Sequence, residues 1–247
     1  MAGHSHSANI AVRKGKQDTA RAKRFSKLAR YIMIAAKHGG GDPDTNLRLR
    51  YAIDKARHVS MPKDNIERAV LKGTGDLEGV SYDEITYEGY GPGGVAVLVE
   101  TLTDNRNRTS GEVRLIFDKA GGNMGAIGCV SYLFERKGLI VLDAATYPDE
   151  DTVMAAALDA EADDVQRAGD VFEITCDLTK FDAVRQKLAA AGFDPVEAEI
   201  KQLAKAGAAV DVDTGRKIVR LIDTLDNHDD VQAVYTTADL TDEMLAE

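Results

Sequence analysis

The sequence contains few cysteines and no long hydrophobic run. Its two cysteines, Cys129 and Cys176, lack C-x-x-C spacing, which argues against a zinc site or a disulfide scaffold. The longest apolar stretches, 31–36 and 94–99, fall far short of the roughly 20 residues that cross a bilayer. No apolar segment follows the basic residues near the N-terminus, so no secretory signal is indicated. We therefore expect a reduced, cytoplasmic protein without a membrane partner.

Motifs for catalysis and cofactor binding are also missing. The glycine-rich stretches 89–94 and 121–125 lack the Gly-Lys-Ser/Thr ending of a P-loop and do not fit G-x-G-x-x-G. We interpret them as turns, or as loops that approach a partner closely. Ala2-Gly3-His4 with a free amine can hold copper or nickel, but adventitious binding explains it better. Since no nucleophile, base and orienting group can be nominated, we expect no enzyme, no cofactor, no metal and no small-molecule substrate.

The charge is divided unevenly along the chain. Residues 1–75 contain 16 basic and 6 acidic residues, whereas the remainder contains 15 basic and 35 acidic residues. The overall balance of −10 therefore hides a basic N-terminal third. A basic module favours a polyanionic partner, and the acidic remainder argues against the whole molecule lying on that partner.

The N-terminal third is predicted to form a basic arm and a bundle of three helices. Apolar residues recur at helical spacing from Phe25 to Ala36, and Gly39 supplies a stop. Asp42-Pro43 is expected to open the second helix as a cap and first-turn proline. Pro62 is expected to open the third helix, and Gly73 to close it.

After a linker at 73–79 the hydrophobic period changes from 3.6 to 2. We expect strands at 82–88, 95–103 and 129–134, and a helix at 110–120. The next block follows the order β-α-β-β-α-β, which is typical of a ferredoxin-like sandwich. Helix 214–225 and strand 231–236 should return to the sheet that begins at Tyr82. The predicted fold class is α+β. A basic arm and three-helix domain, residues 1–76, is followed by a middle α/β sandwich domain, residues 77–137 plus 206–247. The second α/β sandwich domain, the acidic ferredoxin-like segment 138–205, is inserted in the middle domain.

The density of cations from Arg13 to Lys27 is the strongest local signal, because Asp18 is the only acid among seven basic residues. A basic arm that runs into a helix can follow a line of phosphates, although a solvated helix face is the usual meaning of such residues. A second candidate lies at 103–109, where Thr109 and Glu112 have capping-box spacing and two arginines would meet a helix N-terminus. These arginines form either a phosphate seat or ion pairs, with Arg106 bound to Asp104 or a nearby glutamate. The candidate nucleic-acid-binding residues are Arg13, Lys14, Lys16, Arg21, Lys23, Arg24, Lys27, Arg30, Arg106 and Arg108.

Several segments carry a resemblance to a known family. The opening MAGHS, the stretches KGKQDTARAKRFSKLAR and MPKDNIERA, the turn YEGYGPGG, and the loops TDNRNRT and GGNMG resemble the YebC family. Bacterial members are described as probable transcriptional regulatory proteins, and a mitochondrial relative is a translational activator of cytochrome c oxidase. The resemblance implies three domains, one helical and two α/β, a cytoplasmic location, no known catalytic activity, and binding to DNA or to the ribosome.

Three functional hypotheses follow from these observations. The first is a non-enzymatic DNA-binding transcriptional regulator, although the sequence shows no clear helix-turn-helix pair. The second is a translation factor that binds RNA or the ribosome, since charge alone does not distinguish DNA from RNA. The third and most remote is an enzyme that acts on a phosphorylated small molecule at Arg106 and Arg108.

Overall fold

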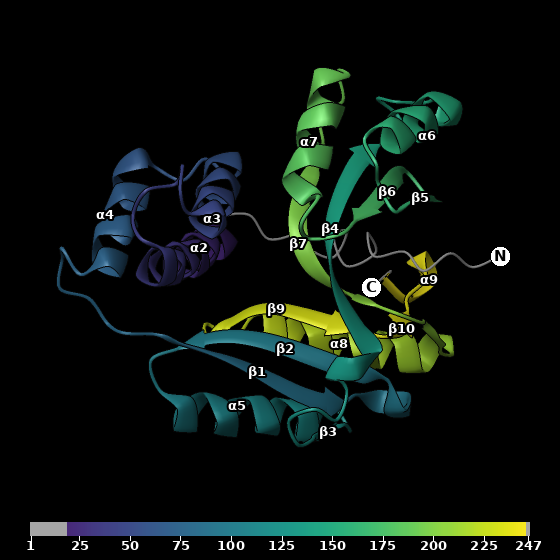
Figure 1. The fold of residues 1–247 in the computed structure, drawn as a ribbon. Coiled ribbons are helices and arrows are strands. Elements are labelled where there is room, and N and C mark those ends of the chain that lie inside the picture. The colour runs from purple at the N-terminus through teal and green to yellow at the C-terminus, as the bar shows by residue number, and fades with distance from the viewer. Residues whose placement is uncertain (1–18, 246–247) are drawn as a thin grey trace. The chain divides into compact units, whose positions relative to one another are not determined.

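The structure is a computed structural model that describes residues 19–245, with side chains in the first helix from residue 22 onward. The described residues form two compact units, one made of 19–129 and 220–234 and the other of 130–219 and 235–245. N-terminal helices are followed by two four-stranded sheets with their helices (Figure 1), which confirms the predicted α+β class. The predicted three-domain boundaries stay a prediction.

The first unit begins with a bundle of three helices, labelled α2 to α4 in Figure 1. Their apolar positions recur at helical spacing and close into one core, in which Ile32, Leu49 and Ala56 are fully buried. The helices are α2 (Thr19–Gly39), α3 (Leu47–His58) and α4 (Lys63–Thr74).

Two of the expected helix boundaries in the bundle are wrong. Asp42-Pro43 lies in a turn, and α3 is capped by Asn46, whose side-chain oxygen accepts from the Leu49 N–H at 3.1 Å. The Asn46 amide also donates to the Ala35 carbonyl at 2.8 Å, so this cap joins α2 to α3. At the end of α4, Gly75 is the left-handed residue, with φ 88°, rather than Gly73. Position 73 is glycine for another reason, since a Cβ there would lie 2.3 Å from a carbonyl oxygen of α2.

The first sheet has the strand order β3-β1-β2-β9, and β1 pairs antiparallel with β2 along its whole length. The last strand returns from the far end of the sequence to lie beside β2, as predicted. Helix α5 lies along one face of the sheet in Figure 1 and buries Val113 and Phe117. The elements are β1 (Asp83–Tyr90), η2 (Pro92–Gly94), β2 (Ala96–Thr103), α5 (Arg106–Lys119), β3 (Asn123–Met124), α8 (Val212–Asp226) and β9 (Val231–Thr236).

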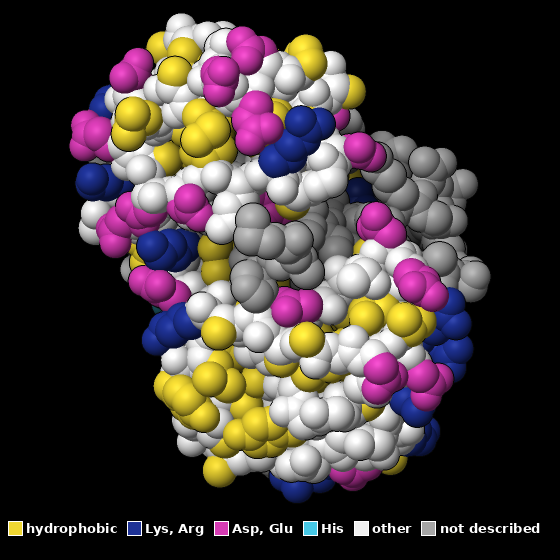
Figure 2. Space-filling view, turned by 90° about the vertical axis from the view of Figure 1, so that its right-hand side faces the viewer, with side chains coloured by type: hydrophobic (Ala, Val, Ile, Leu, Met, Phe, Trp, Pro, Cys, Tyr) yellow, Lys and Arg dark blue, Asp and Glu magenta, His cyan; other side chains and the backbone are white. Residues whose placement is uncertain are grey.

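The second sheet confirms the ferredoxin-like prediction, because its order is β5-β6-β4-β7 with antiparallel neighbours throughout. One strand prediction is wrong: 129–134 is not a strand, since pairing with β7 starts only at Phe134 and continues to Val141. Large hydrophobic side chains stay exposed on α6, and Figure 2 shows hydrophobic and acidic side chains intermixed on the face that it displays. The elements are η3 (Ser131–Leu133), β4 (Phe134–Asp143), α6 (Glu150–Asp159), β5 (Asp164–Ala168), β6 (Val171–Cys176), α7 (Phe181–Ala190) and β7 (Glu197–Ala204), followed by three short elements that were not predicted, β8 (Ala208–Ala209), β10 (Ala238–Asp239) and α9 (Asp242–Leu245).

Candidate nucleic-acid interface

Three of the predicted cations form a row on α2. Lys23, Lys27 and Arg30 are four and three residues apart, so they share one face of the helix. Each donates to a backbone carbonyl at the end of α8 or in the turn before β9: Lys23 Nζ to Asn227 O at 2.7 Å, Lys27 Nζ to Asp226 O at 2.6 Å, and Arg30 Nη1 to Asp229 O at 2.6 Å. Carbonyls at a helix C-terminus carry partial negative charge. The row therefore already binds oxygen acceptors within the protein.

A buried carboxylate connects this row to α5. The side chain of Asp230 is 3% exposed, and its Oδ1 accepts from Arg30 Nη1 at 3.0 Å. Its Oδ2 accepts from Arg108 Nη2 at 2.6 Å, Thr109 Oγ1 at 2.7 Å and Thr103 Oγ1 at 3.1 Å. Cations that are far apart in the sequence, one on α2 and one on α5, thus meet at one aspartate.

The hydrogen bonds at Asp230 decide its charge. Burial raises the pKa of this carboxyl, but the donors Thr109, Arg108 and Thr103 outweigh burial and hold the pKa below its ordinary value. The group is therefore ionised over the neutral pH range. Its single negative charge offsets part of the positive charge of the two arginines that contact it.

The start of α5 differs from the prediction. The helix begins at Arg106, and its cap is Asn105, whose Oδ1 accepts from the Arg108 N–H at 3.1 Å. The expected capping box is wrong, because Thr109 points inward, is fully buried, and bonds to Asp230 instead. The Thr109 hydroxyl stabilises the fold more in this position, because it donates a hydrogen bond to the buried carboxylate of Asp230.

Both arginines of this segment have carboxylate partners. Arg106 Nε lies 2.9 Å from Asp83 Oδ2, which lowers the pKa of Asp83 below its ordinary value. Arg108 Nη2 lies 2.9 Å from Asp104 Oδ1, in addition to its bond to Asp230. The predicted partner of Arg106, Asp104 or a glutamate, is thus replaced by an aspartate of β1. A phosphate at this position would compete with the carboxylates, and the phosphate seat stays a prediction.

The other predicted residues divide into two groups. Arg24 is exposed on α2 and has no ion pair with the residues whose side chains are described. The remaining candidates, Arg13, Lys14, Lys16 and the side chain of Arg21, lie outside the described part of the chain.

The sequence analysis did not identify Asp230 as a functional residue. Its neighbour Asp229 has a side chain that is 70% exposed, whereas Asp230 is buried. The available signal was its position directly before the apolar strand β9, which places it at the edge of a core.

The glycine-rich loops and their tyrosines are explained largely by contacts inside the protein. A Cβ at Gly122 would lie 2.4 Å from the Tyr90 carbonyl oxygen, and one at Gly125 would lie 2.6 Å from Cys129 Sγ. The half-buried Tyr90 donates its hydroxyl to Cys129 O at 2.9 Å. Close approach to a partner is therefore not needed to account for these glycines, although Ile127 at the tip of the loop is 91% exposed.

No group of three or more potential ligands in residues 19–245 is arranged to hold a metal ion, and no helix there is long and apolar enough to span a membrane. Both cysteines are free thiols, and burial raises the pKa of Cys176 to about 11. This thiol is therefore protonated at neutral pH and unreactive.

Comparison with known proteins places the chain in a family of multidomain α+β proteins. Residues 5–76 match the TACO1/YebC protein N-terminal domain, and residues 82–238 match the TACO1/YebC second and third domain. The chain belongs to the TACO1/YebC family, as the sequence motifs indicated.

Relatives in bacteria cover the chain from end to end. It is 51% identical over 247 residues to a probable transcriptional regulatory protein of Desulfatibacillum aliphaticivorans, covering 100% of both chains. It is 48% identical over 245 residues to one of Dictyoglomus turgidum, covering 99% of this chain and 98% of the relative. The crystal structure of a conserved hypothetical protein from Aquifex aeolicus is similar, with a TM-score of 0.89, 43% identity, and coverage of 98% of this chain and 100% of the other.

Proposed function

We propose that the protein is a non-enzymatic, cytoplasmic regulator that binds nucleic acid, with DNA binding in transcription as its first role. The observation that carries this proposal is the row of Lys23, Lys27 and Arg30, which presents three cations along one face of α2 to oxygen acceptors. The names of the bacterial relatives support the regulatory part of the proposal.

The members of the row have different roles. Arg30 is only 20% exposed and contacts the buried Asp230, so it anchors α2. Lys23 is 45% exposed and its pair with Asp229 spans 3.5 Å, an arrangement that contributes little in water. A phosphodiester group presents a full negative charge to a lysine, whereas the carbonyls at the end of α8 present only a partial negative charge. Nucleic acid therefore binds by exchanging the turn contacts of Lys23 and Lys27 for phosphates, with Arg24 alongside.

The test is a charge reversal, measured by fluorescence anisotropy with a labelled duplex over a series of KCl concentrations. Lys23→Glu, Arg24→Glu and Lys27→Glu together should weaken binding by at least about 100-fold. If about seven phosphates are neutralised, log K against log salt should slope about −6 for the wild type. Lys63→Glu, Arg68→Glu and Lys72→Glu on α4 make the same charge change away from the row. Equal losses in both triple variants, or no loss in the first, would overturn the proposal.

An RNA or ribosome partner is the second candidate, and the loop at 121–128 favours it. The segment around its exposed Ile127 is held by Glu88, since the backbone N–H of Gly125 donates to Glu88 O at 2.8 Å and that of Gly128 donates to the side-chain Oε1 at 2.7 Å. An apolar side chain gains nothing from duplex phosphates, whereas the unstacked bases of a folded RNA offer it an apolar face. Sedimentation of lysate through sucrose separates the candidates: persistent co-migration with 50S or 70S particles indicates translation, whereas its absence together with sequence-selective DNA retention indicates transcription.

A further inference from the structure

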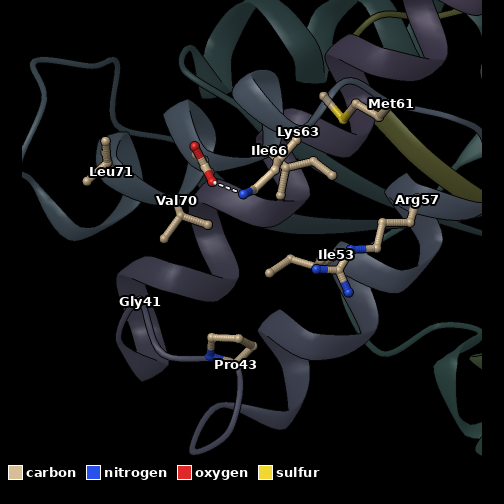
Figure 3. A pocket seen from close by; sticks show the side chains of 10 residues that line it. Gly41, Pro43, Ile53, Arg57, Met61, Lys63, Ile66, Val70 and Leu71 are labelled. Carbon is tan, nitrogen blue, oxygen red and sulfur yellow. Dashed lines mark ion pairs between the residues drawn. The ribbon is translucent and has the colours of Figure 1, made fainter.

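A groove lies in the helical bundle between α3, α4 and the loop that joins α2 to α3. Its volume is about 520 Å³, and none of its lining residues belongs to α2. Figure 3 shows the side chains of Ile53, Ile66 and Val70 around this space, with Pro43 on the opposite side. The lining residues are Gly41, Pro43, Ile53, Arg57, Met61, Lys63, Ile66, Glu67, Val70 and Leu71.

The floor of the groove is apolar. Ile53, Met61 and Ile66 belong to the bundle core and are only 6–7% exposed, so the groove is a shallow continuation of that core. Leu71 at its side is 42% exposed, which leaves a large apolar side chain in water. Apolar side chains of a partner would remove this surface from water, and such burial is the main favourable contribution to association.

Two of the three charged residues that line the groove are cations, Arg57 and Lys63, and the third is Glu67. Arg57 is 71% exposed and its partner Asp54, 3.7 Å away, lies on the same helix. Lys63 is 86% exposed and pairs at 3.4 Å with Glu67, again on its own helix (Figure 3). Exposed pairs of this kind contribute only about 0.2–0.5 kcal/mol, so both cations stay available to a partner.

We infer that this groove binds an acidic amphipathic helix from a partner protein. Apolar side chains at helical spacing would enter the floor, and flanking carboxylates would meet Arg57 and Lys63. The volume suits a few apolar side chains and lies in the ordinary range for binding sites. Nucleic acid fits less well, because the floor is apolar and none of the described lining residues has an aromatic side chain to stack a base. The inference does not depend on the function proposed for α2.

Fluorescence anisotropy with two labelled synthetic peptides tests the inference. One peptide has leucine at positions i, i+3, i+4 and i+7 with glutamate at most other positions, and its counterpart has lysine in place of glutamate. The full-length protein should bind the glutamate peptide saturably and the lysine peptide at least about tenfold more weakly. Arg57→Glu with Lys63→Glu, and separately Leu71→Glu, should each weaken the glutamate peptide by at least about tenfold.

The matched control is Arg68→Glu with Lys72→Glu, which makes the same charge change at exposed positions of α4 outside the groove. It should change peptide affinity by no more than about twofold. Equal binding of both peptides, or unchanged affinity in the groove variants, would overturn the inference. Self-association of the protein that Leu71→Glu abolishes would also overturn it, because the groove would then bind a second copy of the chain. Loss of duplex binding in the groove variants without loss of peptide binding would overturn it as well.

Discussion

Two sets of cations in the same bundle differ in what holds them. Lys23, Lys27 and Arg30 on α2 are bonded to carbonyls and a buried carboxylate that lie about 200 residues further along the chain. Within the described part of the chain, Arg57 and Lys63 at the groove form ion pairs with neighbours on their own helices. The first set therefore has a structural role as well as a proposed binding role. The ion pairs of the second set contribute so little free energy that a partner can replace them at almost no cost. Cation density in the sequence does not reveal this difference.

The largest effect is expected from the carboxylate under the first set. Asp230→Ala should lower the free energy of unfolding by about 3 kcal/mol, because it removes the buried carboxylate that two hydroxyls and two arginines share as an acceptor. Urea denaturation measures the change. Glu67→Ala, which removes the Lys63 pair in the second set, should cost less than about 0.5 kcal/mol. Equal costs for the two variants would show that Asp230 does not hold the first set in place.

The pH dependence of the free energy of unfolding tests the role of Asp230 further. Because the pKa of Asp230 is lowered in the folded state, its stabilisation is fully present above the unfolded carboxyl pKa, about 3.9, and is lost as the pH falls through the folded value. The difference in unfolding free energy between the wild type and Asp230→Asn should therefore be constant from neutral pH to about pH 5 and shrink below about pH 4. Urea denaturation at each pH measures it. A difference that stays constant in acid would contradict a lowered pKa.

Much of the fold could be predicted from the sequence, because its causes are local. The switch from period 3.6 to period 2 and the order β-α-β-β-α-β are visible in the chain, and both appear in the structure. Boundaries set by distant contacts could not be predicted. Asn46 caps α3 partly because it also bonds to α2, and Gly73 is glycine because α4 passes close to α2.

The candidate site was less predictable for the same reason. The cations of α2 were found by their density, but their acceptors belong to the turn at 226–230, which no spacing rule connects to them. Arg106 likewise pairs with Asp83 of β1 rather than with a neighbour in its own loop. A charged side chain is visible in the sequence, whereas the group that neutralises it depends on tertiary structure.

The smallest effect is expected from removing the Asp229 carboxylate, which competes with phosphates for Lys23. Asp229 is 70% exposed and forms a 3.5 Å pair with Lys23, so Asp229→Asn should remove this competitor with little loss of stability. If phosphates replace the turn at Lys23, duplex affinity should rise about two- to threefold in anisotropy titrations. Asp213→Asn is the control, since it removes the same charge from an exposed residue that pairs with Lys217 instead. An equal rise in both variants would indicate a long-range charge effect. Weaker binding by Asp229→Asn would mean that the turn holds Lys23 in its binding position, and that phosphates add to the turn contacts rather than replace them.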